Sequence, residues 1–168
     1  MNIRVASTAD LLELRQLAID AFVNAYAIFN KETDIQQYLA ENFSEEVLRA
    51  ELTNPDVVIL LAEQENQILG YVKLVPGGSE DLKFIRPVEI ARLYSAVHVI
   101  GNGIGKKLVA ASFDFARANN YDGIWLGVWQ KNFRAVNFYQ REGFRITGVT
   151  VFKLGDDVQD DFIMAMQV

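Results

Sequence analysis

A loop with three glycines constrains the fold of this chain more than any other stretch. Gly101, Gly103 and Gly105 follow residues 88–96, an apolar run that is typical of a buried strand. A helix is expected after them, because apolar residues recur there at helical spacing and would share one face: Ile104, Leu108, Ala111, Phe115 and Ala118. The glycines therefore lie between a strand and the N-terminus of a helix.

This position favours the binding of an anion. The first backbone N–H groups of a helix have no partner within it, and the helix dipole attracts negative charge to that end. Glycines let the backbone approach a ligand closely. Lys106 and Lys107 lie in the first turn, where cations are unfavourable unless an anion such as a phosphate accompanies them. A plain glycine-rich connection with two solvated lysines is the alternative.

Two common phosphate-binding motifs are excluded. The dinucleotide fingerprint G-x-G-x-x-G requires a third glycine where this chain has Lys106. The Walker loop G-x-x-x-x-G-K-S/T would place Ile100 at its first glycine and Lys107 at its hydroxyl residue. A nucleotide-hydrolysing function therefore has little support.

Composition narrows the class of protein further. The length of 168 residues predicts one domain, 1–168. The net charge of -6 disfavours nucleic acid as a partner and suits a cationic small molecule, although it also simply aids solubility. The absence of cysteine excludes disulfides and a cysteine nucleophile, and one histidine cannot form a metal-binding cluster. We expect a cytoplasmic protein without a signal peptide or membrane segment.

Alternation and periodicity predict a mixed α/β fold. Strands are expected at 3–5, 57–62, 68–74, 88–96, 124–128, 144–152 and 161–166, and helices at 11–21, around 35–39, at 44–52, 104–118 and 133–142. The strands 57–62 and 68–74 would form a hairpin, and the last two strands an antiparallel pair. Ser44 and Asn132 are suited to cap the helices that follow them.

The glycine loop resembles the acyl-CoA loop of the GNAT superfamily of N-acetyltransferases, R/Q-x-x-G-x-G/A. Gly103-Ile104-Gly105 matches its second half, and Ile100 stands where the family has Arg or Gln. The family segment N-x-x-A-x-x-F-Y-x-x-x-G-F matches more closely, at Asn132, Ala135, Phe138, Tyr139, Gly143 and Phe144. The resemblance implies a mostly antiparallel sheet flanked by helices, with a splayed central strand pair. Dimers are common in this family.

The resemblance also implies the site. Acetyl-CoA would be the co-substrate, with no metal. The cofactor-binding residues would be Leu93, Tyr94, Ser95, Gly101, Asn102, Gly103, Ile104, Gly105, Lys106 and Asn132. Tyr139 would protonate the departing thiolate, since a phenol with a pKa of about 10 is a suitable donor; a core aromatic is the alternative. Direct attack by the amine is favoured, because no cysteine is present to form an acyl-enzyme.

The general base is less well defined by the sequence. Some family members carry a carboxylate at the position that Gly127 fills, so this base is missing. Glu89 is a candidate, although an acidic residue at the start of a strand is usually solvated. His98 titrates near neutral pH but lies beside the phosphate loop, which favours a surface role. A water relay or a backbone carbonyl is a further alternative.

The acceptor is predicted to be a primary amine. Residues 24–54 resemble the bacterial spermidine/spermine acetyltransferase branch, which implies a polyamine. Aromatic residues of this region are candidates for an acceptor pocket, with helix packing as the alternative: Phe22, Tyr26, Phe29 and Tyr38. Trp125 and Trp129 are expected in the core or in a pocket wall. Two other functions stay open: an N-acetyltransferase acting on proteins or peptides, and a non-catalytic acyl-CoA-binding module.

Overall fold

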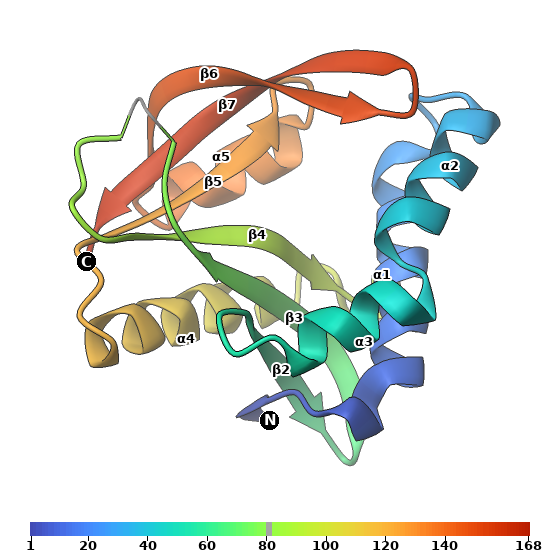
Figure 1. Cartoon of the computed structure of the whole chain (residues 1–168), viewed down its shortest axis with the longest axis horizontal. Coiled ribbons are helices and arrows are strands. Elements are labelled where there is room, and N and C mark those ends of the chain that lie inside the picture. The colour runs from blue at the N-terminus through green and yellow to red at the C-terminus, as the bar shows by residue number, and fades with distance from the viewer. Residues whose placement is uncertain (80–81) are drawn as a thin grey trace.

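A seven-stranded sheet with the order β1-β2-β3-β4-β5-β7-β6 forms the centre of the molecule in the computed structural model, which describes residues 1–79 and 82–168 (Figure 1). The strands are β1 (Asn2–Val5), β2 (Val58–Gln64), β3 (Gln67–Pro76), β4 (Pro87–Ser95), β5 (Gly123–Trp129), β6 (Arg145–Leu154) and β7 (Asp157–Gln167). All neighbouring strands are antiparallel except β4 and β5, which are parallel. The mostly antiparallel sheet predicted from the sequence is confirmed.

Helices cover both faces of the sheet. They are α1 (Leu11–Tyr26), α2 (Glu32–Asn42), α3 (Glu45–Thr53), α4 (Ile104–Ala118) and α5 (Phe133–Arg141), with short 3₁₀ turns η1 (Thr8–Asp10) and η2 (Val97–Val99). Side chains of β2 alternate between two cores. Leu60 and Ala62 pack on the side of α4, while Ile59 and Leu61 pack on the side of α1–α3. Burial on both faces explains why this strand is continuously apolar.

Local sequence signals mark the start of α3 and both ends of α5. Ser44 caps α3 by accepting a hydrogen bond from the Val47 N–H, and Asn132 caps α5 by accepting one from the Ala135 N–H at 3.1 Å. Gly143 ends α5 with a φ of +99°. None of the helices in the described part of the chain is long and apolar enough to cross a membrane.

The buried face of α4 differs from the predicted one. The side chains that pack against the sheet are Ile104, Leu108, Val109, Ser112, Phe113 and Ala116. Ala111 and Phe115 lie at the margin of this face, and Ala118 is exposed. The prediction was wrong here because apolar residues occupy both possible faces, so that periodicity alone does not fix the rotation of the helix. Contact with β3 decides it: a Cβ on Gly70 would lie 2.9 Å from Ile104 Cγ2.

The central parallel pair separates after only three paired positions. Pro87, Val88 and Glu89 pair with residues 123–125 of β5, and the rest of β4 has no strand beside it on that edge. A bulge accompanies the separation: Leu74 of β3 pairs with Ile90 but Lys73 pairs with Arg92, so Ala91 is an extra residue. Bulges bend a strand and re-aim its side chains. Figure 1 shows β4 and β5 diverging from this point, as expected for the splayed pair.

Candidate active site

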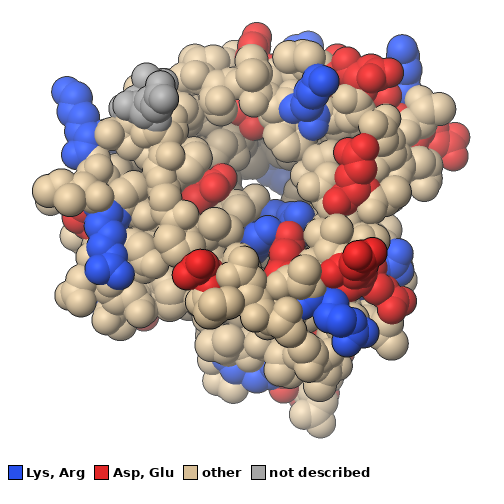
Figure 2. Space-filling model, in the orientation of Figure 1, with Lys and Arg blue, Asp and Glu red and all other residues tan. Residues whose placement is uncertain are grey.

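A cavity of about 680 Å³ lies where β4 and β5 separate. Strands β4 and β5, the start of α4, helix α5 and the C-terminal part of α1 contribute to its lining. Figure 2 shows this face of the molecule hollowed near its middle, with acidic and basic side chains around the opening. The cavity is continuous from the glycine loop to a group of aromatic side chains, so it can hold two reactants at once.

The glycine loop forms one end of the cavity. Gly101 and Gly103 have φ angles of +92° and +81°, which L-residues with a Cβ rarely adopt, and Gly103 is the N-cap of α4. The first backbone hydrogen bond of the helix runs from the Lys107 N–H to the Gly103 carbonyl at 3.2 Å. The N–H groups of residues 104–106 therefore have no acceptor within the helix, and they are available to an anion.

Close packing at Gly105 joins three elements beside this loop. A Cβ on Gly105 would lie 3.2 Å from Phe138 Cζ and 3.6 Å from Leu93 Cδ2, so a larger residue would push α4 away from α5 and β4. Residues 93–95 pair with β3 on one edge only. Their other edge borders the cavity, where an extended ligand could bond to the free backbone groups as an added strand.

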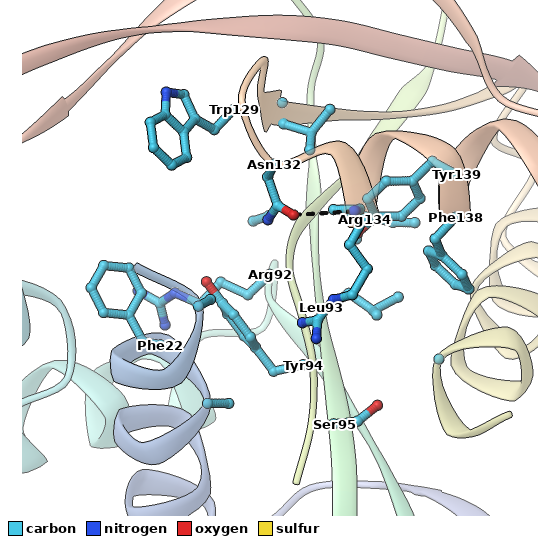
Figure 3. Close-up of a pocket in the computed structure, with 18 of the residues that line it drawn as sticks. Phe22, Arg92, Leu93, Tyr94, Ser95, Trp129, Asn132, Arg134, Phe138 and Tyr139 are labelled. Atoms are coloured by element: carbon cyan, nitrogen blue, oxygen red, sulfur yellow. Dashed lines mark hydrogen bonds between the residues drawn. The ribbon is translucent and has the colours of Figure 1, made fainter. Parts of the chain in front are cut away.

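Asn132 and Tyr139 also line the cavity, from the start and the middle of α5. Figure 3 shows Asn132 and Arg134 facing Tyr94 of β4 across the cavity. Tyr139 is 8% exposed and contacts Phe138 and Phe144 edge to face. Burial raises the pKa of its phenol, which keeps the proton on the oxygen at neutral pH. Tyr139 is thus a packed aromatic and a cavity residue together.

Aromatic rings from the N-terminal helices form the other end. Phe22 stacks on Tyr38 with ring centroids 4.5 Å apart, and Tyr26 lies 6.1 Å from Trp129. These four side chains line the cavity, as does Trp125, whose indole N–H donates to the Gly77 carbonyl. Phe29 is 59% exposed and contacts Trp129 from outside the lining, so its predicted place in the pocket wall is wrong.

Two carboxylates also belong to the lining of this cavity. Glu89 is half-buried, which corrects the expectation that it is solvated, and burial raises its pKa. Asp161 of β7 is 7% exposed; burial, and then the nearby charge of Asp160, raise its pKa to about 6. The sequence reasoning missed Asp161. Its alternation with Ile163 and Ala165 was the available signal, but the intervening residues are equally apolar.

Arg92 is a lining residue that shares one carboxylate partner with Lys73. Its guanidinium donates to Glu51 at 2.9 Å and lies over the Phe43 ring at 4.6 Å from the centroid. Glu51 also pairs with Lys73 at 2.5 Å, and burial lowers the pKa of that lysine. This network of Glu51, Lys73 and Arg92 is the paired-charge cluster of the molecule, and it holds α3 against β3 and β4.

The structure brings nearly all of the predicted site residues together. Those in the cavity lining are Leu93, Tyr94, Ser95, Gly101, Gly103, Ile104, Gly105, Lys106, Asn132 and Tyr139. Asn102 is not among the lining residues; its backbone N–H is bonded to the Val99 carbonyl at 3.1 Å, and its side chain is exposed. His98 is exposed on η2 and is likewise outside the lining.

A separated parallel strand pair beside a glycine-rich helix start is the arrangement expected of an acyl-CoA-dependent acyltransferase. Residues 13–144 match the model of the acetyltransferase (GNAT) family, and the chain belongs to this family. It is an N-acetyltransferase that uses acetyl-CoA and transfers the acetyl group to an amine. The free β4 edge, the unbonded N–H groups of α4 and the Tyr139 phenol fit this co-substrate.

Individual relatives agree with this assignment. An uncharacterized N-acetyltransferase of Mycobacterium bovis is 32% identical over 80% of this chain and 82% of its own length. A Thermoplasma acidophilum spermidine N(1)-acetyltransferase is 26% identical over 98% and 95%. A T. acidophilum N-acetyltransferase solved in complex with coenzyme A superimposes with a TM-score of 0.80, at 24% identity over the full length of both chains. A Brucella melitensis ribosomal-protein-alanine N-acetyltransferase superimposes with a TM-score of 0.70, at 25% identity over the full length of both.

Proposed function

We propose that the acceptor is a small polycationic amine such as a polyamine. The observation that carries this proposal is that two carboxylates, Glu89 and Asp161, line one cavity together with the aromatic rings of Tyr26 and Trp129. Carboxylates and aromatic faces both attract alkylammonium groups. The net charge of -6 and the name of the Thermoplasma spermidine acetyltransferase are additional support.

The site residues have separate roles in this proposal. Acetyl-CoA supplies the acetyl group as an activated thioester. The unbonded backbone N–H groups of residues 104–106 bind its pyrophosphate, and residues 93–95 bind its pantetheine arm through the free edge of β4. Asn132 contributes a polar contact from the start of α5. Tyr139, which lines the cavity and carries its phenolic proton at neutral pH, donates this proton to the departing sulfur.

A peptide N-terminus is the second candidate acceptor. The name of the Brucella structure, an enzyme for the alanine of a ribosomal protein, favours it. An N-terminal ammonium group would satisfy one cavity carboxylate, whereas a polyamine has further ammonium groups for the second. The two acceptors therefore differ in how strongly binding depends on charge.

Release of free CoA from acetyl-CoA in the presence of three acceptors tests the proposal. Spermidine, n-butylamine and a short peptide with N-terminal alanine are compared at low and high salt. We expect spermidine to have the highest kcat/KM, and its advantage over n-butylamine to shrink with salt as the charges are screened. A preference for the peptide that does not change with salt contradicts the polyamine assignment and leaves the acetyltransferase assignment intact.

A further inference from the structure

Asp161 is a buried carboxylate with an unsatisfied oxygen. It is 7% exposed, and its Oδ1 has no hydrogen-bond partner among the residues that the structure describes. Nor does it form an ion pair with any of those residues. Leaving a buried charge without a partner is costly, so proteins rarely do so outside functional sites. The missing partner therefore points to a ligand that enters the cavity.

Gly127 provides the space into which this carboxylate extends. The two residues lie on neighbouring strands, where Trp129 of β5 pairs with Asp161 of β7. A Cβ on Gly127 would lie 3.5 Å from Asp161 Oδ2, in van der Waals contact, so a longer side chain there would compete for the same space. Gly127 leaves β5 without an acid at this position, as the sequence indicated, and the carboxylate of Asp161 from β7 lies beside it.

The groups that face Asp161 suit a cation. The side chains of Tyr26 from α1 and Tyr38 from α2 are close enough for the Asp161 charge to raise their pKa values. On the strands, Trp129 and Thr150 are its paired neighbours, and the adjacent Asp160 is exposed. Arg92, another charged residue of the lining, is paired with Glu51. The remaining charged residues of the lining are Glu89, Lys106, Arg134, Arg141 and Glu142.

We propose that Asp161 binds the ammonium group of the acceptor and then accepts its proton, acting as the general base of acetyl transfer. This inference rests on acetyl transfer to an amine, and it does not depend on the amine being a polyamine.

Protons and electrons balance as follows. One proton moves from the ammonium nitrogen to the Asp161 carboxylate and later to solvent. The freed lone pair forms the new N–C bond to the acetyl carbon, and the C–S bond breaks. The nitrogen loses its second proton as the amide forms, and this proton restores the Tyr139 phenol, which has given its own proton to the departing sulfur. A carboxyl group with a pKa of about 6 is ionised at neutral pH and is more basic than an exposed carboxylate. Asp160 contributes to this value through like charge.

The first test is the pH dependence of kcat/KM for wild type, Asp161→Asn and the control Asp160→Asn. Spermidine and the alanine peptide both serve as acceptors, because each presents an ammonium group. Wild type should lose activity tenfold per pH unit below about 6. Asp161→Asn should lose roughly 10²–10⁴-fold at pH 8 and no longer show the acidic limb. Asp160→Asn, an exposed neighbour on β7, should keep near-normal activity at pH 8, with its acidic limb moved to lower pH.

The second test is independent of turnover and needs only the wild-type fold. The carboxyl carbon of Asp161 is followed by ¹³C NMR, with its resonance assigned by its loss in Asp161→Asn or by sequential assignment. We expect a pKa near 6 that falls when n-butylamine is added without acetyl-CoA. A pKa near 4 that the amine does not move overturns the proposal. The proposal is also overturned if Asp161→Asn has a kcat/KM within threefold of wild type and still loses activity at acidic pH, whichever acceptor proves faster.

Discussion

The paired-charge cluster and the cavity bury carboxylates in opposite ways. Glu51 is 13% exposed and contacts two cations, Lys73 and Arg92, which tie α3 to the sheet. Asp161 is buried to a similar degree, yet its Oδ1 has no partner within the described residues. A buried acid with paired charges is costly to remove, because its cations would be left without a partner, whereas a buried acid without a partner raises the energy of the empty site. The presence or absence of a charged partner therefore distinguishes a carboxylate that holds the fold together from one of the cavity better than its exposed fraction does.

Two buried tyrosines extend the comparison and give the largest expected effect. Tyr139→Phe removes only the hydroxyl in the cavity, and kcat should fall roughly 10²–10⁴-fold while acetyl-CoA affinity changes little. Tyr71 is 1% exposed, lies outside the cavity lining, and has a hydroxyl without a partner in the described part of the chain. Tyr71→Phe is therefore the matched control and should keep wild-type kcat. Steady-state kinetics measures kcat for both variants. An acyl donor whose thiol leaves more readily should partly restore the kcat of Tyr139→Phe. Equal kcat values in the two variants would exclude Tyr139 as the general acid.

Removing the shared acid of the paired-charge cluster should be the most destabilising change. Glu51→Gln leaves Lys73 and Arg92 close together without a counter-charge, and we expect a loss of about 3 kcal/mol in the free energy of unfolding. Glu46→Gln, an exposed acid on the same helix, should cost less than about 1 kcal/mol. Urea denaturation of both variants measures this. Equal stabilities would mean that the cluster does not hold α3.

Replacing an acid by its amide in the cavity should instead raise the free energy of unfolding. The pKa of Asp161 is raised by burial to about 6 in the folded state, so its ionisation opposes folding above pH 6. The free energy of unfolding of Asp161→Asn should therefore exceed that of wild type by about 1–2 kcal/mol at pH 8. This difference should disappear between pH 6 and 4 as the wild-type carboxylate becomes protonated. Urea denaturation at pH 8 and pH 4.5 measures it, and a variant less stable at pH 8 would contradict the assignment of an unpaired charge.

Two glycines of positive φ give the smallest expected effect. Gly103 and Gly77 both have left-handed φ angles and open space around a hypothetical Cβ, so valine strains the backbone similarly at each. Only Gly103 begins α4 and lines the cavity. Gly103→Val should weaken acetyl-CoA binding by about tenfold (~1.4 kcal/mol), and Gly77→Val should leave the affinity unchanged. Calorimetric titration decides between them; an equal loss in both variants would point to general strain.

The sequence predicted the elements and the cofactor end of the cavity well. Both ends of α5 have local signals, Asn132 at its start and Gly143 after its end, and Tyr139 lies seven residues after the cap on the same helix face. The glycine loop joins a strand and a helix directly. The order and spacing of neighbouring residues are sufficient for such features, because helical and strand geometry connect residues that are close in the chain.

The positions of the cavity carboxylates Asp161 and Glu89 could be found only from the tertiary structure. The place of Asp161 beside Gly127 follows from the register between β5 and β7, and the half-burial of Glu89 follows from the end of strand pairing beside the Ala91 bulge. Neither register nor bulge is encoded by a short periodic pattern. The sequence by itself determined which segments form strands, helices and the glycine-rich turn before α4. Only the packed sheet decided which carboxylates are paired and which face the cavity, because pairing requires partners from distant parts of the chain.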